Sequence, residues 1–300
     1  MRELLDAARR YALADANVLI TGETGAGKDA LAQFLHASGP RRRLPFITID
    51  CPGLPATLVE SELFGFERGA FTDATTARVG RLEAAGSGTV YLDAVSTLRA
   101  DAQGALLRVV EEKRVTRLGG NTAIDLRARI IASADADIES AVRDGLFRTD
   151  LYHRLHVLPL LIPPLRERQE DILPLARVFI TSTAKELKRP APVLTPDAED
   201  TLLRYHWPGN VRELQHALQR ALVAGAGDRI STSDLPTDLL ERPEGHLTAA
   251  AESRPTLEQV ERRYIQLTLS HTKGNQTKAA QILGISRKAL WEKRKRYGIE

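Results

Sequence analysis

Val18–Asp29 reads VLITGETGAGKD, and this stretch decides the fold. Its first three residues are apolar and β-favouring, so they predict a buried strand. Glycines and a lysine follow, and a helical pattern runs from Leu31 to His36. A strand, a glycine turn and a helix N-terminus form a phosphate cradle, because the glycines let backbone N–H groups converge on the anion and the lysine reaches the terminal phosphates. The predicted nucleotide-binding residues are Gly22, Glu23, Thr24, Gly25, Ala26, Gly27, Lys28 and Asp29.

A second feature supports a nucleotide rather than an ordinary glycine turn. The pattern G-x-x-x-x-G-K-[ST] is met up to Lys28, although Asp29 stands where a hydroxyl is expected. Thr89–Asp93 (TVYLD) is another buried strand, and it ends in an acid. In a phosphate-loop protein such a carboxylate can hold the Mg²⁺ that bridges the phosphates. We therefore predict a nucleotide and Mg²⁺ as ligands, with Asp93 on the metal.

Composition excludes several classes of protein. Of the 300 residues, 43% are hydrophobic and 27% charged, as in ordinary soluble domains. The single cysteine, Cys51, excludes an internal disulfide and favours a reducing compartment. The longest apolar run is short and interrupted by prolines, and the N-terminus has no signal-peptide pattern. We expect a cytoplasmic protein without a membrane partner.

Positive charge is concentrated at the C-terminus. Residues 271–300 hold eight Lys or Arg against only Glu292 and Glu300, whereas the first 270 residues are slightly acidic. A small basic module on an acidic body indicates a polyanionic partner. Gln276–Leu283 is predicted as a helix, Gly284 as a turn, and Ser286 as the cap of a helix that ends at Tyr297. Leu290 and Tyr297 then share one face and pack inward, and the basic residues face outward.

The order of patterns predicts the domains. Strands alternate with helices over the first 160 or so residues, which indicates an α/β fold with a parallel sheet between helices. An N-terminal helix over Arg2–Ala14, a helix over Leu58–Phe64 and a hairpin over Arg114–Leu126 are expected within it. After Pro163–Pro164 we expect only helices, at Ile172–Leu187, Pro196–Tyr205 and Val211–Ala224. The predicted boundaries are 1–162 for the nucleotide-binding domain, 163–237 for a helical lid, 238–255 for a linker and 256–300 for a helix-turn-helix.

Five motifs in order make a family resemblance specific. They are GETGAGKD, GAFTDA, GTVYLDA, FRTDLYHRL and WPGNVREL. The chain resembles the bacterial enhancer-binding proteins, the AAA+ activators of sigma-54 RNA polymerase of the nitrogen-regulator type, and its last 45 residues are similar to a Fis-type helix-turn-helix. The resemblance implies duplex DNA and the sigma-54 RNA polymerase holoenzyme as partners, and a homo-oligomeric ring, a hexamer or heptamer.

The resemblance also implies roles for particular residues. The loop that touches the sigma factor corresponds to Gly69, Ala70, Phe71, Thr72, Asp73 and Ala74, and we expect Phe71 to be exposed rather than a buried anchor. Arg148 and Arg154 match arginines that a neighbouring subunit inserts toward the nucleotide, where a cation stabilises the transition state; surface ion pairs are the alternative.

Arg212 matches the lid arginine that senses nucleotide, and Asn210 is expected to cap its helix. The DNA-binding residues are Lys278, Arg287, Lys288, Trp291 and Lys295, suited to phosphates and base edges in a major groove. Arg294 stands where the family usually has an apolar residue.

Four departures from the family cluster at the chemistry. Ala94 replaces the acid that polarises the attacking water, Asp50 replaces the asparagine that restrains that acid, and Asp135 replaces the sensor asparagine near the γ-phosphate. Asp73 replaces a loop glycine. Loss of a general base typically costs on the order of a hundred- to ten-thousand-fold in rate. Asp50 and Asp135 are therefore either remnants of a decayed site or, for Asp50, a substitute base.

The sequence thus predicts a DNA-binding regulator that binds ATP and acts on sigma-54 polymerase from a site upstream of the promoter. The alternative is a regulator, a repressor or sigma-54-independent, in which ATP drives assembly and hydrolysis is deficient. A small-molecule kinase is a poor third interpretation, because it leaves the basic helix-turn-helix unexplained. Whether the chain is an ATPase depends on how Ala94 is compensated.

Overall fold

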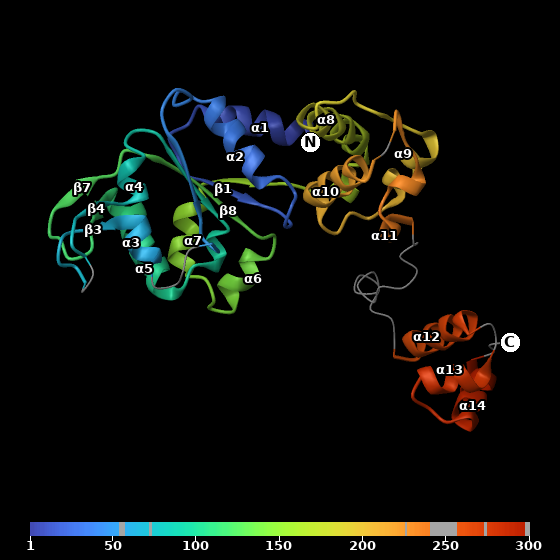
Figure 1. Cartoon of the computed structure of the whole chain (residues 1–300). Helices are drawn as coiled ribbons and strands as arrows, with labels where there is room; N and C mark the ends of the chain where they lie inside the picture. The colour runs from blue at the N-terminus through green and yellow to red at the C-terminus, as the bar shows by residue number, and fades with distance from the viewer. Residues whose placement is uncertain (54–57, 72–73, 226, 241–256, 273–274, 298–300) are drawn as a thin grey trace. The chain divides into compact units, whose positions relative to one another are not determined.

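The computed structural model describes residues 1–53, 58–71, 74–225, 227–240, 257–272 and 275–297 (Figure 1). The chain divides into two compact units, Met1–Leu240 and Glu241–Glu300. Among the described residues, no helix is both long and apolar enough to cross a membrane.

The centre of the first unit is a five-stranded parallel sheet. Its strand order is β2 (Phe46–Asp50), β5 (Thr89–Asp93), β8 (Arg129–Ala134), β1 (Val18–Thr21) and β9 (Leu158–Leu161). Because all five strands run in the same direction, their carboxyl ends meet at one edge of the sheet. This edge carries the glycine loop after β1, Asp50, Asp93 and the residues after β8.

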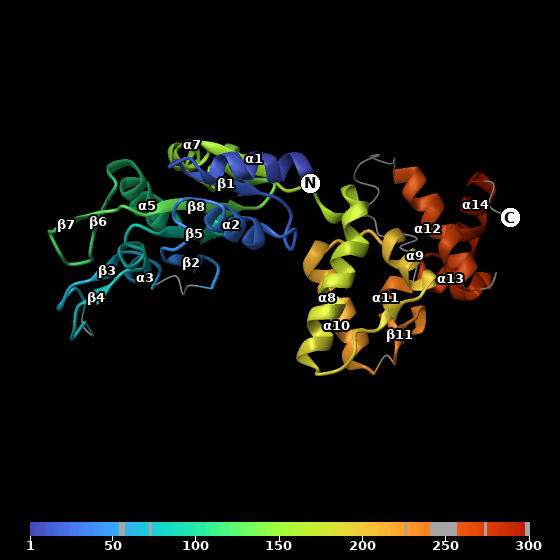
Figure 2. The same cartoon turned by 90° about the horizontal axis from the view of Figure 1, so that it is seen from above.

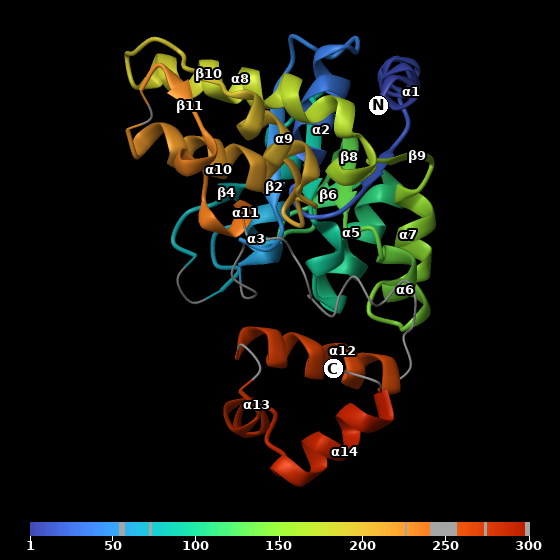
Figure 3. The same ribbon diagram turned by 90° about the vertical axis from the view of Figure 1, so that its right-hand side faces the viewer.

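Helices cover both faces of this sheet, as the sequence predicts. Alternation along β1 places Val18 and Ile20 in one core and Leu19 in the other, because successive strand residues point to opposite faces. The first core is closed by α1 (Arg2–Ala12) and α2 (Lys28–Ala37). The second core contains residues of α3 (Val59–Phe64), α4 (Arg81–Ala84), α5 (Ala100–Glu112), α6 (Ile138–Arg143) and α7 (Thr149–Leu155). Figures 1 and 3 show both helical layers. The N-terminal helix ends at Ala12, two residues before the predicted end.

Two short antiparallel pairs leave the sheet on the side of the domain away from the lid (Figure 2). One pairs β3 (Gly65–Phe66) with β4 (Arg78–Val79), and the predicted hairpin pairs β6 (Arg114–Thr116) with β7 (Ala123–Asp125). A bridge between Phe66 and Leu118 joins them. This arrangement leaves Phe71 of the Gly69–Ala74 loop 44% exposed.

The lid has its own core around Trp207. Its helices are α8 (Ile172–Glu186), α9 (Pro196–Arg204), α10 (Asn210–Val223) and α11 (Thr237–Leu240), with 3-10 turns at Leu165–Glu167, Gln169–Asp171 and Thr232–Asp234. Trp207 is fully buried, and its Nε1 donates to the carbonyl of Leu202 at 2.9 Å. The Trp207 ring also packs edge-on against Tyr205.

The structure corrects two expectations about the lid. It is not purely helical, because β10 (Val193–Leu194) and β11 (Arg229–Ile230) form a two-stranded parallel pair. A two-residue strand has too little periodicity to register in a sequence pattern. The linker also does not begin at Asp238: residues 238–240 belong to α11, and Leu239 is buried in the lid core. Residues 241–255 of the predicted linker lie outside the described residues.

The second unit contains three described helices. They are α12 (Leu257–His271), α13 (Gln276–Ile282) and α14 (Arg287–Tyr297). Gly284 adopts a φ of 65° at the turn, and Ser286 Oγ accepts from the Ala289 N–H at 3.1 Å, as a capping residue does. Leu290 and Tyr297 are buried against α12 and α13, which confirms the predicted inward face of α14.

Candidate functional site

The glycine loop has the backbone of a phosphate cradle. It connects β1 to α2, and Gly25 and Gly27 adopt φ angles of 77° and 105°, a region that residues with a Cβ rarely enter. A Cβ at Gly25 would lie only 2.3 Å from the Gly209 carbonyl oxygen of the lid. The loop therefore needs glycine here both for its turn and for the close approach of the lid. The first amides of α2 lie next to this loop, where a helix favours an anion.

Lys28 is almost buried, and its ammonium is held by three oxygens. Nζ donates to the carbonyls of Gly22 at 2.7 Å and Glu23 at 3.4 Å, and to Asp135 Oδ1 at 3.1 Å. Only 9% of the residue is exposed. Asp135 reaches the lysine because it follows β8, whose last residue, Ala134, pairs with Thr21 of β1. Of the two unusual aspartates, the structure thus brings Asp135 to the lysine.

Asp93 and Asp29 are joined through a tyrosine. The Tyr91 hydroxyl lies 2.8 Å from Asp29 Oδ1 and 3.0 Å from Asp93 Oδ1, and burial raises the pKa of this phenol. Ser133 Oγ donates to Asp93 Oδ1 at 2.5 Å. Sequence reasoning missed Tyr91 and Ser133. Tyr91 lies two residues before Asp93 in the same strand, so the period of two already placed both on one face.

This arrangement fits a magnesium ion on Asp93. Asp93 Oδ2 accepts no hydrogen bond from the described residues, and Mg²⁺ prefers carboxylate oxygen, water and phosphate. The described residues contain no group of three or more His, Cys, Asp or Glu side chains that could hold a metal by themselves. The chain's own metal ligand would be Asp93, and phosphates and water would supply the remaining ligands. Asp29 would contact this ligand only through the Tyr91 hydroxyl.

Ala94 and Asp50 lie beside Asp93 at the carboxyl edge. Ala94 has φ 51° and ψ 52°, and its N–H donates to Ser133 Oγ at 2.8 Å. Asp50 pairs in register with Asp93, and its exposed carboxylate lies so close over Gly53 that a Cβ there would be 2.4 Å from Asp50 Oδ2. Asp50 makes no hydrogen bond to a described side chain. Its role as a substitute base stays a prediction.

The lid is hydrogen-bonded directly to the glycine loop. Arg166 donates to both carboxylate oxygens of Glu23, at 2.6 and 2.9 Å. Asn210, which is fully buried, donates to Glu23 Oε2 at 3.0 Å and to the Thr24 carbonyl at 3.1 Å. We call Glu23, Arg166 and Asn210 the lid latch. Because Glu23 faces the lid, its side chain is not placed toward the cradle, although it was predicted among the nucleotide-binding residues.

The latch corrects the expected role of Asn210. It does not cap α10: it is the first residue of that helix, with φ 53°, and Gly209 is the N-cap. Its Oδ1 instead accepts from the backbone of Leu165 at 2.8 Å. Arg168 adds a further contact, since its NH2 donates to the Ala26 carbonyl at 2.7 Å. The Asn210 amide bonds to Leu165, Glu23 and Thr24, so it does not bond to the N–H groups at the start of its own helix.

We expect Glu23→Arg to weaken the attachment of the lid, because two cations would then face each other. Adding Arg166→Glu restores an ion pair, so the two changes should show a coupling free energy of about 1 kcal/mol in a double-mutant cycle. Urea unfolding, followed by Trp207 fluorescence in a Trp291→Phe background, measures it. Additive effects of the two single changes would contradict the latch.

The same pair gives the latch a pH dependence. Hydrogen bonding from Arg166 lowers the pKa of Glu23 below its ordinary value. A carboxyl with a lowered folded-state pKa stabilises the protein above its unfolded pKa, and this contribution is lost as the pH falls through the lowered value. The coupling free energy should therefore decrease in acid.

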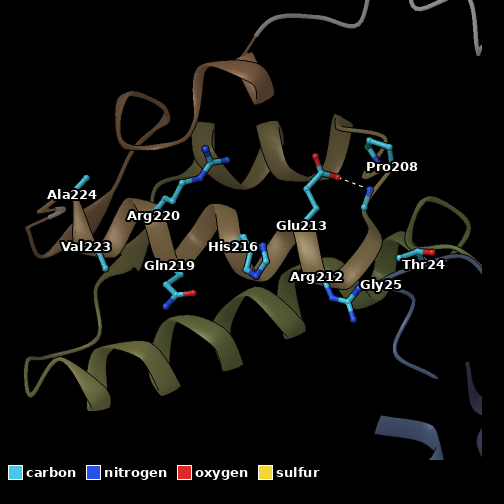
Figure 4. Close-up of a pocket in the computed structure, with 11 residues that line it drawn as sticks. Thr24, Gly25, Pro208, Arg212, Glu213, His216, Gln219, Arg220, Val223 and Ala224 are labelled. Carbon is cyan, nitrogen blue, oxygen red and sulfur yellow. Dashed lines mark hydrogen bonds between the residues drawn. The ribbon is translucent and has the colours of Figure 1, made fainter. Parts of the chain in front are cut away.

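A cavity of about 1040 Å³ lies between the loop and one face of α10 (Figure 4). Thr24 and Gly25 line its loop end. Arg212 lies at the end of α10 nearest the loop, and its backbone N–H donates to the Gly25 carbonyl at 3.3 Å. Glu213 Oε2 accepts from the Gly209 N–H at 2.8 Å, the bond drawn in Figure 4. The predicted sensing arginine thus lies beside the phosphate loop.

The side chains of Arg148 and Arg154 lie on the protein surface, 49% and 60% exposed. Arg148 donates to both oxygens of Asp150, at 3.0 and 2.8 Å, and Arg154 donates to Glu111 at 2.9 Å. This hydrogen bonding lowers the pKa of Asp150 and raises that of Arg148. Both arginines make the surface ion pairs that the sequence left open, and such exposed pairs contribute little to stability.

The Gly69–Ala74 loop has a firm base. Gly69 N–H donates to the Ala74 carbonyl at 2.8 Å, and the Phe71 ring packs against Phe66 at 4.9 Å between centroids. Phe71 is 44% exposed, so it is both anchored and accessible. Ala70 completes the described part of the loop, and the predicted Thr72 and Asp73 lie outside the described residues.

The basic residues of the second unit differ in their contacts. Lys293 donates to Glu261 of α12 at 2.5 Å, and Arg296 to Glu258 at 3.1 Å. The predicted DNA-binding side chains are all exposed: Lys278, Arg287, Lys288, Trp291 and Lys295. Lys295 Nζ lies 5.5 Å from the centre of the Trp291 ring. Part of the basic charge therefore holds the domain together, and the exposed residues remain for an anionic partner.

Comparison with known proteins identifies all three parts of the chain. Residues 1–161 match the sigma-54 interaction domain, residues 166–252 the AAA+ ATPase lid domain, and residues 256–297 the bacterial regulatory protein, Fis family. The chain is 43% identical over 293 residues to the transcriptional regulatory protein ZraR of Klebsiella oxytoca, covering 98% of this chain and 66% of that protein. It is 38% identical over 326 residues to the DNA-binding transcriptional regulator NtrC of Klebsiella pneumoniae, covering 100% of this chain and 69% of that protein.

A solved structure agrees with this assignment. The crystal structure of NtrX from Brucella abortus in complex with ATP superposes with a TM-score of 0.74 at 31% identity, covering 100% of this chain and 68% of that one. The chain spans about two thirds of the length of the curated relatives it matches. The chain belongs to the sigma-54-dependent AAA+ transcriptional regulators, in which a sigma-54 interaction domain is followed by a lid and a Fis-type helix-turn-helix.

Proposed function

We propose that this chain is a DNA-bound transcription regulator that binds ATP and acts on RNA polymerase carrying sigma-54. The observation that supports it most is the structure of the glycine loop. The loop carbonyls hold the buried Lys28, and lid side chains donate hydrogen bonds to the same loop backbone. Structures of NtrX from Brucella abortus in complex with ATP and with ADP, at 31% identity, support nucleotide binding at this fold.

The chain's residues would divide the work as follows. The amides of Gly22–Gly27 and the first turn of α2 bind the phosphates, and Lys28 neutralises their charge. Asp93 would hold Mg²⁺, which would supply positive charge to the phosphate oxygens. Arg212 lies where α10 meets the loop, so a nucleotide there would contact both core and lid.

The surface arginines support a ring as part of this proposal. Arg148 and Arg154 lie on the protein surface, and a cation at the γ-phosphate stabilises the transition state of phosphoryl transfer. We propose that each subunit presents these arginines to the nucleotide of its neighbour, and that ATP promotes this homo-oligomer. Phe71, anchored on Phe66 and partly exposed, would contact the sigma factor.

Hydrolysis is the step in which this chain differs from its family's pattern. Ala94 offers no carboxylate to polarise water, and Asp135 is bonded to Lys28. These observations favour slow turnover. The comparisons lend no support to a repressor or to a regulator independent of sigma-54, so we retain the activator as the proposed function and expect ATP binding to exceed hydrolysis.

The function is tested by open-complex formation on a sigma-54 promoter, measured with holoenzyme, this protein and ATP. Nucleotide-dependent open complexes are expected, and light scattering in the same buffer reports the ring. A Lys28→Ala protein that supports equal open-complex formation would overturn the role of the loop. A strictly monomeric protein under every nucleotide condition would overturn the ring.

We expect Arg287→Ala with Lys288→Ala to weaken duplex DNA binding in a salt-dependent manner. Each lost phosphate contact reduces the slope of log K against log salt by about 0.9, so the slope should fall by about 1.8. Gel-shift titrations between low and moderate salt measure this change. Arg177→Ala with Arg204→Ala removes the same charge from the exposed lid surface and serves as the control. Equal slopes for the wild type and the α14 variant would contradict DNA binding by this helix.

A further inference from the structure

The Lys28 ammonium has as many oxygen partners as it has hydrogens. An ammonium offers three N–H donors. Two of them point to carbonyls of its own loop, those of Gly22 and Glu23, and the third points to the Asp135 carboxylate at 3.1 Å. Thr24 Oγ1 lies 3.5 Å from the same carboxylate oxygen. Asp135 therefore places a carboxylate beside the Lys28 ammonium, at the position where a phosphate would contact it.

The two partners of this ion pair differ in their freedom to move. The Lys28 side chain is 10% exposed, whereas that of Asp135 is 46% exposed. The lysine is fixed by packing and by the loop carbonyls, and the aspartate can turn into solvent. A ligand that needs the ammonium must displace the carboxylate, not the lysine.

A nucleoside diphosphate and a nucleoside triphosphate differ in how much negative charge they place beside the Asp135 carboxylate. A loop lysine reaches the terminal phosphates of a nucleotide, while loop amides and the helix N-terminus bind the inner ones. A diphosphate keeps the amide contacts. A triphosphate also places about one more negative charge beside the Asp135 carboxylate, where like charges repel. The neighbouring carboxylates at this edge, Asp50 and Asp93, add to that repulsion unless a cation offsets it.

We propose that Asp135 makes this site selective for nucleoside diphosphate over triphosphate, by occupying the Lys28 ammonium in place of the terminal phosphate. This inference rests on the nucleotide binding proposed above. The resting occupant of the site is then ADP with the Lys28–Asp135 pair intact. To bind the γ-phosphate, the site must first break the Asp135–Lys28 ion pair, and this costs free energy.

The test compares two ligands on the full chain in the presence of Mg²⁺. Isothermal titration calorimetry measures the Kd of ADP and of β,γ-imido-ATP, a nonhydrolysable triphosphate. Asp135→Asn keeps the shape and a hydrogen-bond acceptor but removes the charge. We expect it to tighten the triphosphate analogue about tenfold relative to ADP, the size of one partly screened charge contact. Asp137 is an exposed residue two positions on, and the hydrogen bonds and ion pair of Lys28 do not include it. Asp137→Asn should leave both Kd values unchanged.

The outcomes separate the two proposals. If both ligands bind and Asp135→Asn leaves their Kd ratio as in the wild type, the selectivity is overturned and nucleotide binding stands. The same holds if Asp137→Asn shifts the ratio as much as Asp135→Asn, since general charge would then be responsible. If neither ligand binds either protein, and thermal unfolding shows both to be folded, the proposed function fails and the selectivity fails with it.

Discussion

Asp50→Asn, Ala94→Glu and Asp135→Asn combined in one chain are expected to raise ATP turnover on the order of a hundred-fold or more, the usual contribution of a positioned general base. Position 94 follows Asp93 at the carboxyl edge of the sheet, where a glutamate can reach water beside the phosphates. The two asparagines remove the anions that oppose the γ-phosphate. Steady-state phosphate release from the full chain, with DNA and Mg²⁺ present, measures the gain.

The control isolates the base from the shape of the side chain. Ala94→Gln in the same double-asparagine background carries the same bulk and the same backbone strain, since residue 94 adopts a left-handed conformation in the wild type. Equal turnover of the glutamate and glutamine variants would refute a base at this position. If Asp50→Asn alone abolishes a measurable wild-type rate, Asp50 is the substitute base; if wild-type turnover is not above background, the site has decayed.

Trp207→Ala is expected to lower the free energy of unfolding of the lid by about 3–5 kcal/mol. The side chain is fully buried, and truncation leaves both a cavity and an unpaired Leu202 carbonyl. Urea unfolding followed by far-UV circular dichroism measures the loss. The second tryptophan of the chain, Trp291, is 56% exposed, and Trp291→Ala should change the free energy by less than about 0.5 kcal/mol. A comparable loss from both substitutions would contradict a lid core built around Trp207.

The sequence predicted the fold best where a buried apolar run adjoined a motif. Val18–Ile20 before the glycine loop fixed β1, and Thr89–Asp93 fixed β5, because both strands are buried on two faces and read as continuous apolar runs. The helix-turn-helix was equally accessible, since Gly284 and Ser286 mark its turn and cap. The β10–β11 pair was missed because two residues are too few to show a period.

The site was only partly accessible for a different reason. Motifs name residues by position along the chain, but contacts such as Lys28–Asp135 and Glu23–Arg166 join residues more than a hundred positions apart. Asn210 shows the limit most clearly. Its place after a glycine is typical of a helix cap, and only the packing of the lid on the loop shows that its amide serves that contact instead. Tertiary structure decided these roles, and no local pattern carries that information.

The sequence of β9 also obstructs the pairing of a further strand at one outer edge of the sheet. β9 is an edge strand, and the N–H groups of Leu158 and Ile162 donate inward to the carbonyls of Asn17 and Thr21. Alternation then directs position 159 outward, and Pro159 has no N–H to offer there. Val157 and Leu161 on either side are exposed and apolar, so this edge would otherwise be a template for strand addition. Pro159 therefore removes one of the outward N–H donors that a further strand at β9 would need.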